Sequence, residues 1–446
     1  MKKTYTSPFR IILLGYITII LLGGTLLCFP FSSRSGEWTS FIDSVFTSTS
    51  ATCVTGLIRF DTYQHWSLIG QIIILLLIQV GGIGFMSLAM MFFSVTRKNI
   101  SISGRMLMKE SVSAPQIGGA YKITRIIITG TALFEGLGAI LLCFHYCPQL
   151  GFVKGLYFSV FHSISAFCNA GFDVMGGIDG VEPMSSLISI QNNAYVSIVL
   201  MFLIVIGGLG FFVWSDIIEH KHHVTHYRVH SKLVLVISAI LIVFGAGLCF
   251  LFDTTVGHEP VSGSTVLHSF FSSISARTAG FTSVDLGKIC QPTQLVLICL
   301  MLIGGSPGST AGGMKTTTFG VVALTILSTI RRKKSVETMG RRISDEVVRN
   351  AACIMLLYIL VMVSSAMAIS AIDNVPILSA MFETASATAT VGSTVGLTPT
   401  LSVASEIIVT LLMLFGRVGG ITMLLAISSD KKTIAKKLPV ENVQVG

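Results

Sequence analysis

Four glycines, each ending a short polar segment, are the residues of this sequence best suited to chemistry. They are Gly56, Gly171, Gly280 and Gly392, and the segments that lead to them read FTSTSATCVTGL, FHSISAFCNAGF, FSSISARTAGF and FETASATATVGS. Each segment opens with Phe, has Ser or Thr two residues later, and then a Ser-Ala pair. Glycine reaches unusual backbone angles without Cβ strain. Four such turns can therefore aim carbonyls at one axis, and rings of carbonyls can replace the hydration shell of a cation.

The predicted cation-binding residues form four short runs, each of which ends at one of these glycines. They are Cys53, Val54, Thr55 and Gly56; Cys168, Asn169, Ala170 and Gly171; Thr278, Ala279 and Gly280; and Ala389, Thr390, Val391 and Gly392. The third segment is one residue shorter than the others, and in the fourth a second glycine, Gly396, follows closely. The alternative is four unrelated glycine-containing loops, but self-similarity at this level indicates one structural unit used four times.

The elements that must position these turns are short helices. The ten or so residues ahead of each Ser-Ala pair, such as 38–49 and 154–165, are rich in apolar residues. A helix of about ten residues reaches only halfway through the hydrocarbon of a bilayer. Irregular backbone at that depth is tolerated only where it is buried in protein or lines water. We therefore expect four half-helices around one cavity, each adding the partial negative charge of its C-terminus.

The composition predicts an all-α integral membrane protein. Of the 446 residues 52% are apolar and 11% charged, with a mean hydropathy of +0.80, whereas soluble domains carry about 25% charged residues. A span needs about 20 mostly apolar residues. The eight candidates are 11–30, 66–95, 126–146, 195–214, 233–252, 293–305, 350–372 and 407–428. The first has no clear cleavage site, so we expect it to remain a span.

Eight spans and four turns predict four repeats of span, half-helix, turn and span around a central pore. The expected boundaries are 8–110, 111–220, 221–335 and 336–428, followed by a tail at 429–446. Most of the 30 Lys and Arg then fall on one side of the membrane. The positive-inside rule places both termini in the cytoplasm of a multi-pass plasma-membrane protein. The basic charge is thus explained by topology, and no nucleic-acid partner is expected.

Other polar segments carry weaker predictions. The nine cysteines show neither metal spacing nor a disulfide framework, and we interpret them as small apolar residues of the spans. The histidine-rich run 219–230 is consistent with a metal site or with a solvated loop. The charged segment 331–349 is either a positive-inside anchor or a docking site for a soluble regulator.

The sixth span is interrupted by the sequence IGGSPGSTAGGMKTTT, which begins at residue 303. So many glycines and a proline cannot form a stable helix, so we expect a break near mid-membrane and a new helix from about Thr316. We predict that this loop, residues 303–317, is a gate across the pore. Its residues are Gly304, Gly305, Ser306, Pro307, Gly308, Ser309, Thr310, Ala311, Gly312, Gly313 and Lys315.

Two catalytic interpretations of this loop are disfavoured. The string GSTAGGMKT has one residue too many for a phosphate-binding loop and lacks the strand-loop-helix context. A serine nucleophile at Ser309 with His162 or His268 as base has nothing that brings these groups together. We therefore expect no catalysis, and the chain is not predicted to be an enzyme.

Two ionisable residues within the spans need a partner. Arg417 lies inside the eighth span, and an arginine at a helix centre costs about 2.5–3.5 kcal/mol on insertion scales. We expect it to face the loop and belong to the gate, with snorkelling to an interface as the alternative. Glu135, in the third span, is expected to form a hydrogen bond between helices.

In these features the sequence resembles the Trk/Ktr/HKT superfamily of potassium transport proteins, and within it the Ktr membrane subunit. The resemblance rests on the turns TCVTGL, FCNAGF, ARTAGF and ATVGST and covers roughly residues 8–429. It implies potassium uptake through a carbonyl filter, because the key position of the first turn is Gly56, where a serine is linked to sodium transport. It also implies a glycine-rich intramembrane gate, a homodimer, and a cytosolic ring of nucleotide-binding RCK-type subunits.

No bound cofactor is expected; potassium is the substrate and sodium a candidate activator. The membrane potential, worth about 2.3 kcal/mol per charge per 100 mV, is the expected driving force. The alternative is a secondary transporter of a small solute whose broken helices hold the substrate. Fourfold rather than twofold repetition favours a bare ion on an axis.

Overall fold

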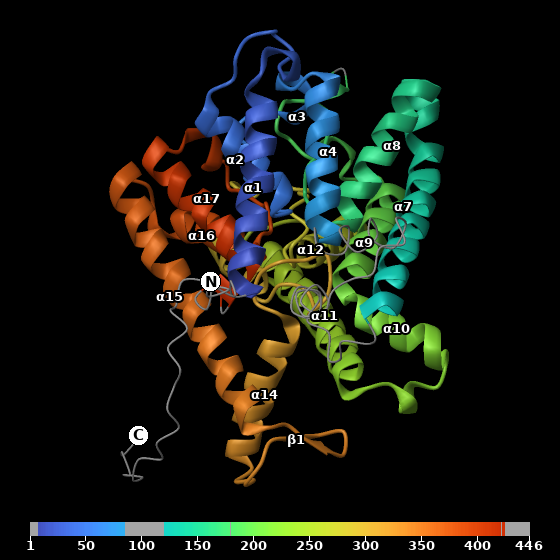
Figure 1. Cartoon of the computed structure of the whole chain (residues 1–446), viewed down its shortest axis with the longest axis vertical. Coiled ribbons are helices and arrows are strands. Elements are labelled where there is room, and N and C mark those ends of the chain that lie inside the picture. Colours follow the sequence, from blue (N-terminus) through green and yellow to red (C-terminus); the bar gives the residue numbers. More distant parts are fainter. Residues whose placement is uncertain (1–7, 85–119, 179, 421, 424–446) are drawn as a thin grey trace, which may run out of the picture.

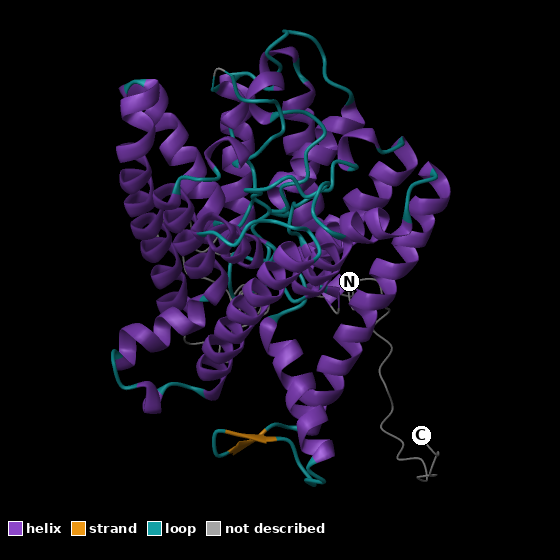
Figure 2. Ribbon diagram, turned by 180° about the vertical axis from the view of Figure 1, so that it is seen from behind, coloured by secondary structure: helices purple, strands orange, loops and turns teal. Residues whose placement is uncertain are grey.

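The computed structural model describes residues 8–84, 120–178, 180–420 and 422–423. Within this part the chain is a bundle of helices with loops that meet inside it (Figures 1 and 2). Four helices are long and apolar enough to cross a membrane, and a fifth span is added if one bent pair is counted. The long helices are α1 (Pro8–Cys28), α7 (Ala120–Leu150), α11 (Val229–Thr255) and α15 (Asp345–Asp373).

A shorter helix packs against each long helix that precedes it in the chain. The pairs are α1 with α2 (Phe41–Thr52), α7 with α8 (Phe152–Phe167), α11 with α12 (Gly263–Ser275) and α15 with α16 (Ile377–Ala389). Three equivalent serines fix these pairs, because Ser48, Ser163 and Ser273 donate to the carbonyls of Ile20, Glu135 and Ile242 at 2.8, 2.7 and 3.0 Å. The same unit of two helices is therefore built at least three times with the same contact.

The phenylalanine that opens each repeated segment lies in the core. Phe46, Phe161, Phe271 and Phe382 are at most 1% exposed. Each of these aromatic side chains is buried between the half-helix and its neighbours, where a large apolar side chain contributes about 1.5–3 kcal/mol relative to exposure. The shared Phe of the sequence pattern is thus a packing residue.

A further helix follows each turn. These closing helices are α4 (Leu68–Ile83), α9 (Ala194–Leu209), α13 (Gln291–Leu302) and α17 (Val403–Val418). They are shorter than a span, so length and composition do not establish the expected eight spans. Three of them end directly before a glycine in the left-handed region, Gly84, Gly210 and Gly419, with φ of 83°, 95° and 91°.

The second closing helix corrects one prediction. We expected a continuous span over 195–214, but the chain bends by 91° between α9 and α10 (Phe211–His220). The bend lies at Gly210, and the backbone N–H of Phe211 donates to the carbonyl of Gly308 at 2.6 Å instead of continuing the helix. A contact from the third repeat therefore replaces the helical hydrogen bond.

The other span ends differ from the predicted ones as well. The helix α17 ends at Val418 and helical backbone resumes at Gly420, while the expected end at 428 lies outside the described residues. The expected continuation of α4 beyond residue 84, the repeat boundary at 110 and the tail at 429–446 lie outside the described residues. In the third repeat α13 ends at Leu302, and α14 (Thr316–Ile330) begins at the residue where the sequence predicted it.

The charged segment between α14 and α15 forms a small hairpin, visible below the bundle in Figures 1 and 2. Its strands β1 (Glu337–Thr338) and β2 (Arg341–Arg342) pair antiparallel. Met339 and Gly340 join them with φ of 49° and 73°, the two positive angles that a type I′ hairpin turn requires. The expectation of helices alone is therefore wrong for these few residues.

The remaining elements are short. They are α3 (Thr62–His65) and the 3-10 turns η1 (Pro30–Ser32), η3 (Met175–Gly177), η4 (Ile188–Ile190), η5 (Val224–His226) and η6 (Thr398–Thr400). The side chain of Asp61 caps α3 by accepting from the backbone N–H groups of Tyr63 and Gln64, both at 2.9 Å. Such a cap satisfies donors that the helix start leaves free.

Candidate functional site

The four turns that follow the half-helices share one backbone shape. In each turn, the glycine and the residue two positions before it have a positive φ. The angles are 56° and 95° for Val54 and Gly56, 57° and 69° for Asn169 and Gly171, 82° and 80° for Thr278 and Gly280, and 54° and 99° for Thr390 and Gly392. Positive φ costs a residue with a side chain about 1–2 kcal/mol. Such strain persists only where the surroundings enforce it, and it gathers at functional sites.

The serine of each Ser-Ala pair holds its turn. The backbone N–H of the residue before the glycine donates to the serine carbonyl at 2.8 Å in all four turns: Thr55 to Ser50, Ala170 to Ser165, Ala279 to Ser275 and Val391 to Ser386. The serine hydroxyls complete the contact in two ways. Ser50 and Ser386 accept from the N–H of the glycine at 3.0 Å, whereas Ser165 and Ser275 donate to the carbonyl of the following Phe. The Ser-Ala pattern is therefore explained by the turn.

The four glycines form a closed ring, which we call the glycine ring. A methyl group placed on each would meet the carbonyl oxygen that precedes the next glycine, with Gly56 against Ala170 at 2.5 Å, Gly171 against Ala279 at 2.7 Å, Gly280 against Val391 at 2.2 Å and Gly392 against Thr55 at 2.1 Å. The order 56, 171, 280, 392 and back to 56 is cyclic. Segments more than 300 residues apart thus place carbonyls around one axis.

The glycine ring is enclosed by protein. The other predicted cation-binding residues, which precede the four glycines in their turns, are at most 1% exposed. The hydroxyls of Thr55, Thr388 and Thr390 have no hydrogen-bond partner in the described part of the chain. Because buried polar atoms are nearly always paired, these oxygens are available to water or to an ion.

Three of the predicted binding residues turn their side chains to other partners. The thiol of Cys168 contacts the amide of Gln79 and the carboxyl of Glu135 at 3.7 and 3.6 Å. The amide of Asn169 and the hydroxyl of Thr278 are hydrogen-bonded at 3.0 Å, which joins the second and third turns. These residues offer only backbone carbonyls to a shared axis.

The loop 303–315 between α13 and α14 lies against the second and fourth closing helices. Ser306 and Thr310 donate backbone N–H groups to the carbonyls of Gly208 and Gly207 at 3.0 and 3.3 Å, and Gly313 donates to Gly416 at 3.3 Å. The Thr310 hydroxyl donates to the carbonyl of Phe167, at the end of α8, at 3.1 Å. The loop therefore crosses from the second repeat to the fourth directly beside one half-helix.

Two cationic side chains hold three consecutive carbonyls of this loop. Arg417 donates to the carbonyl of Thr310, and Lys315 donates to those of Ala311 and Gly312 at 2.8 and 3.2 Å. Arg417 also donates to the carbonyls of Gly81 and Gly82, the latter at 3.2 Å. Neither cation has a carboxylate partner in the described part of the chain.

The remaining predicted loop residues take structural positions. Gly304 and Gly305 follow the short bridge of Ile303 to Met314, and Gly308 supplies the carbonyl that bends α9 from α10. The Ser309 hydroxyl donates to the carbonyl of Ser306 at 2.7 Å. His162 and His268 have their own backbone carbonyl partners, those of Phe158 and Gln191, so no described contact joins either histidine to Ser309.

Two carboxyl groups, one half-buried and one fully buried, belong to the surroundings of the ring. Glu135 accepts from the Gln79 amide at 2.9 Å, a hydrogen bond between α7 and α4 as the sequence predicted. Glu383, which sequence reasoning missed, is fully buried in α16 and accepts from the hydroxyls of Thr398, at 2.7 Å, and Thr394. The sequence feature that could have revealed Glu383 is its position directly after Phe382. A carboxyl group at that place in a buried half-helix needs hydrogen-bond donors.

The histidine run and the cysteines bring no metal ligands together. In the ranges that the structure describes, no group of three or more His, Cys, Asp or Glu side chains could hold a metal ion. All nine cysteines are free.

Comparison with known proteins agrees with the fold. The family model TrkH, described as a cation transport protein, matches residues 17–435. The chain is 38% identical to the potassium/sodium uptake protein NtpJ of Enterococcus hirae, with 99% of this chain and 97% of that protein covered. It is 34% identical to the Ktr system potassium uptake protein B of Vibrio alginolyticus, with 98% and 94% covered.

A solved structure shares the fold. The crystal structure of the potassium transporter TrkH from Vibrio parahaemolyticus matches with a TM-score of 0.71 at 19% identity and covers 96% of this chain and 86% of that one. The matched family consists of membrane cation transporters and not of enzymes, as the sequence predicted. This chain belongs to the TrkH family of cation transport proteins.

Proposed function

We propose that this protein is a Ktr-type membrane subunit that takes up potassium through the glycine ring. The observation that carries the proposal is the cyclic order of the four turns, in which each glycine lies against the carbonyl of the next turn. A ring of carbonyls can replace the hydration shell of a potassium ion. The relatives named as potassium uptake proteins support the choice of ion.

We place eight spans around this ring, with both termini in the cytoplasm. The short closing helices α4, α9, α13 and α17 are the proposed additional spans. Each half-helix ends at its turn, so its free carbonyls add partial negative charge near the ring. A cation on the axis is stabilised by this charge without any carboxylate in the ring.

The loop 303–315 is the proposed gate. Its backbone has no helical hydrogen-bond ladder of its own, and segments with few such bonds open at low free-energy cost. Arg417 and Lys315 hold its carbonyls in the described conformation. Their positive charges also oppose the passage of a cation from the ring. Opening therefore requires the loop and these side chains to move together.

The proposed assembly is a homodimer of this subunit on a cytosolic ring of nucleotide-binding RCK-type subunits. Support comes from relatives named as one component of a Ktr system. The charged hairpin between α14 and α15 reaches away from the bundle and is the proposed contact for the ring (Figure 1). No cofactor is needed on this chain.

Sodium uptake is the second candidate function. The observation that favours it is the name of the 38% identical relative, a potassium/sodium uptake protein. Gly56 of the first turn favours potassium, because the key position is then glycine in all four turns and presents no side chain to the ion. Sodium then acts as an activator or as a weaker substrate.

The test is growth of cells that lack potassium uptake at limiting external potassium. We expect this chain, expressed with its cytosolic partner, to restore growth, and excess sodium to compete weakly. Uptake of labelled potassium that sodium abolishes at equal concentration would support the sodium alternative. If the protein reaches the membrane but does not restore growth, both the potassium and the sodium proposals are contradicted. The remaining hypothesis is then a secondary transporter of a small solute.

A further inference from the structure

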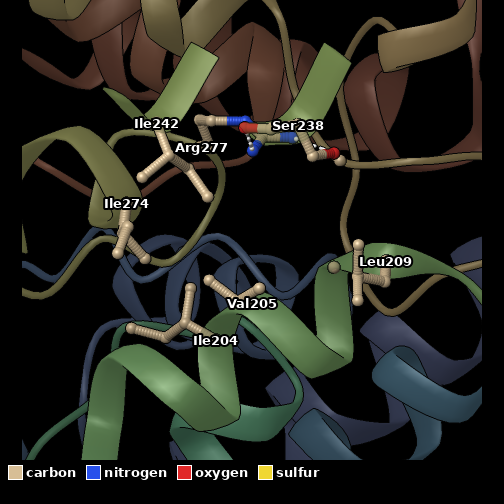
Figure 3. Close-up of a pocket in the computed structure, with 9 residues that line it drawn as sticks. Ile204, Val205, Leu209, Ser238, Ile242, Ile274 and Arg277 are labelled. Carbon is tan, nitrogen blue, oxygen red and sulfur yellow. Dashed lines mark hydrogen bonds between the residues drawn. The ribbon is translucent and has the colours of Figure 1, made fainter. Parts of the chain in front are cut away.

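Arg277 is the one charged side chain among the four repeated turns, and the proposed mechanism does not use it. It follows the last residue of α12 by two positions and directly precedes Thr278 of the glycine ring. Its guanidinium turns away from the ring toward α11, where it donates to the hydroxyl and carbonyl of Ser238 at 3.2 and 3.4 Å (Figure 3). The charge is thus held at a fixed place behind the third turn.

No carboxylate neutralises this guanidinium in the described part of the chain. Its polar contacts are both with Ser238, and its Nε has no hydrogen-bond partner. Two features compensate for the buried charge. The residue stands at the C-terminal end of α12, where the free carbonyls favour a cation, and it lines a small cavity.

The cavity lies between α9, α11 and α12 and has a volume of about 20 Å³. Apolar side chains such as Ile204, Ile242 and Ile274 form its walls (Figure 3). Gly305 of the loop also lines it. This volume holds about one water molecule, which can accept from the unpaired Nε. Such a water and the Ser238 hydroxyl would solvate the guanidinium without removing its charge.

A fixed positive charge behind the third turn weakens the binding of a cation in the ring. Conduction requires binding that is favourable enough for entry and weak enough for release. Four half-helix ends and a ring of carbonyls all attract a cation, so a repelling charge at one turn speeds its release. Because of Arg277, the third turn carries a charge that the other three turns lack.

We propose that Arg277, positioned by Ser238, sets the strength of cation binding in the glycine ring. The proposal rests on the proposed function of the ring as a potassium filter. Arg277 acts through space and does not touch the ion.

The test is the concentration dependence of potassium uptake by purified protein in vesicles. We expect Arg277→Gln to lower both the half-saturating potassium concentration and the maximal rate, by about threefold to tenfold, the size expected for one partly screened unit charge. Arg277→Lys keeps the charge and is expected to resemble the parent. Lys288→Gln, which removes an exposed charge of the same repeat, is the matched control and is expected to change neither value.

A second variant covers the outcome in which Arg277→Gln does not fold. Ser238→Asp leaves the arginine in place and neutralises it, so it is expected to shift the half-saturating concentration in the same direction. An unchanged half-saturating concentration in folded Arg277→Gln or Ser238→Asp overturns the proposal, as does a Lys variant that behaves like Gln. A parent protein that shows no saturable potassium uptake contradicts instead the proposed function.

Discussion

Arg417 of α17 and Thr310 of the loop 303–315, which lie 107 positions apart in the sequence, are joined by a hydrogen bond from the guanidinium to the backbone carbonyl. The same guanidinium reaches the carbonyls of Gly81 and Gly82 at the end of α4. One side chain thus ties the first, third and fourth repeats together. Under the proposed function, a cation in this place both holds the loop and repels an ion.

Replacing Arg417 with glutamine is expected to increase potassium flux and leave selectivity intact. Glutamine keeps some donors and removes the charge, and a hydrogen bond from a charged group contributes about 1.5–3 kcal/mol. Losing one such bond favours the open loop by about tenfold or more. Flux and potassium-over-sodium preference in vesicles measure the two effects. Unchanged flux with a smaller yield of folded protein would show that Arg417 is only structural.

Deletion of residues 307–312 is expected to raise basal potassium flux. The deletion removes the segment whose carbonyls face Arg417 and Lys315, while the turns of the ring keep their own hydrogen bonds. The measurement is uptake without the cytosolic partner, compared with the parent at equal amounts in the membrane. If the folded deletion variant passes no more potassium than the parent, the loop is not a gate.

The sequence predicted those parts of the site that depend on local chemistry. The glycines of the ring stood out because glycine reaches a positive φ without Cβ strain, and each of them has a positive φ. The start of α14 at Thr316 followed from the glycines and proline before it. The Ser-Ala pairs and the opening Phe repeat because each has one local task, to hold the turn or to fill the core.

Features that depend on distant partners were not predicted. The segment around Gly210 has the pattern of one apolar helix, and its bend exists because Phe211 donates to Gly308 in another repeat. The partners of Arg277 and Glu383 lie on other elements or across a loop. The strands of the hairpin have two residues each and leave no periodic pattern.

Gly207 of α9 is expected to be essential for packing. A methyl group there would lie 1.9 Å from the carbonyl oxygen of Phe167, so Gly207→Ala overpacks the contact and costs about 1–3 kcal/mol. Gly136 of α7 is the matched control, because a methyl group on it meets nothing within 4 Å. Thermal unfolding in detergent measures both.

The expected result is a Tm several degrees lower for Gly207→Ala and an unchanged or higher Tm for Gly136→Ala, since alanine favours helix over glycine. Equal Tm values for the two variants would contradict the close approach of α9 to the end of α8.

The most direct test of the central claim is competition between potassium and sodium in vesicles that contain the purified protein, with Gly56, Gly171, Gly280 and Gly392 each changed to serine. A side chain on any of them meets a carbonyl of the next turn within 2.7 Å. Gly36→Ser is the control, because Gly36 also has a positive φ, 72°, but nothing within 4 Å. We predict that the four ring variants lose preference for potassium over sodium and that Gly36→Ser keeps it. Unchanged preference in the folded ring variants would contradict the assignment of the glycine ring as the potassium filter.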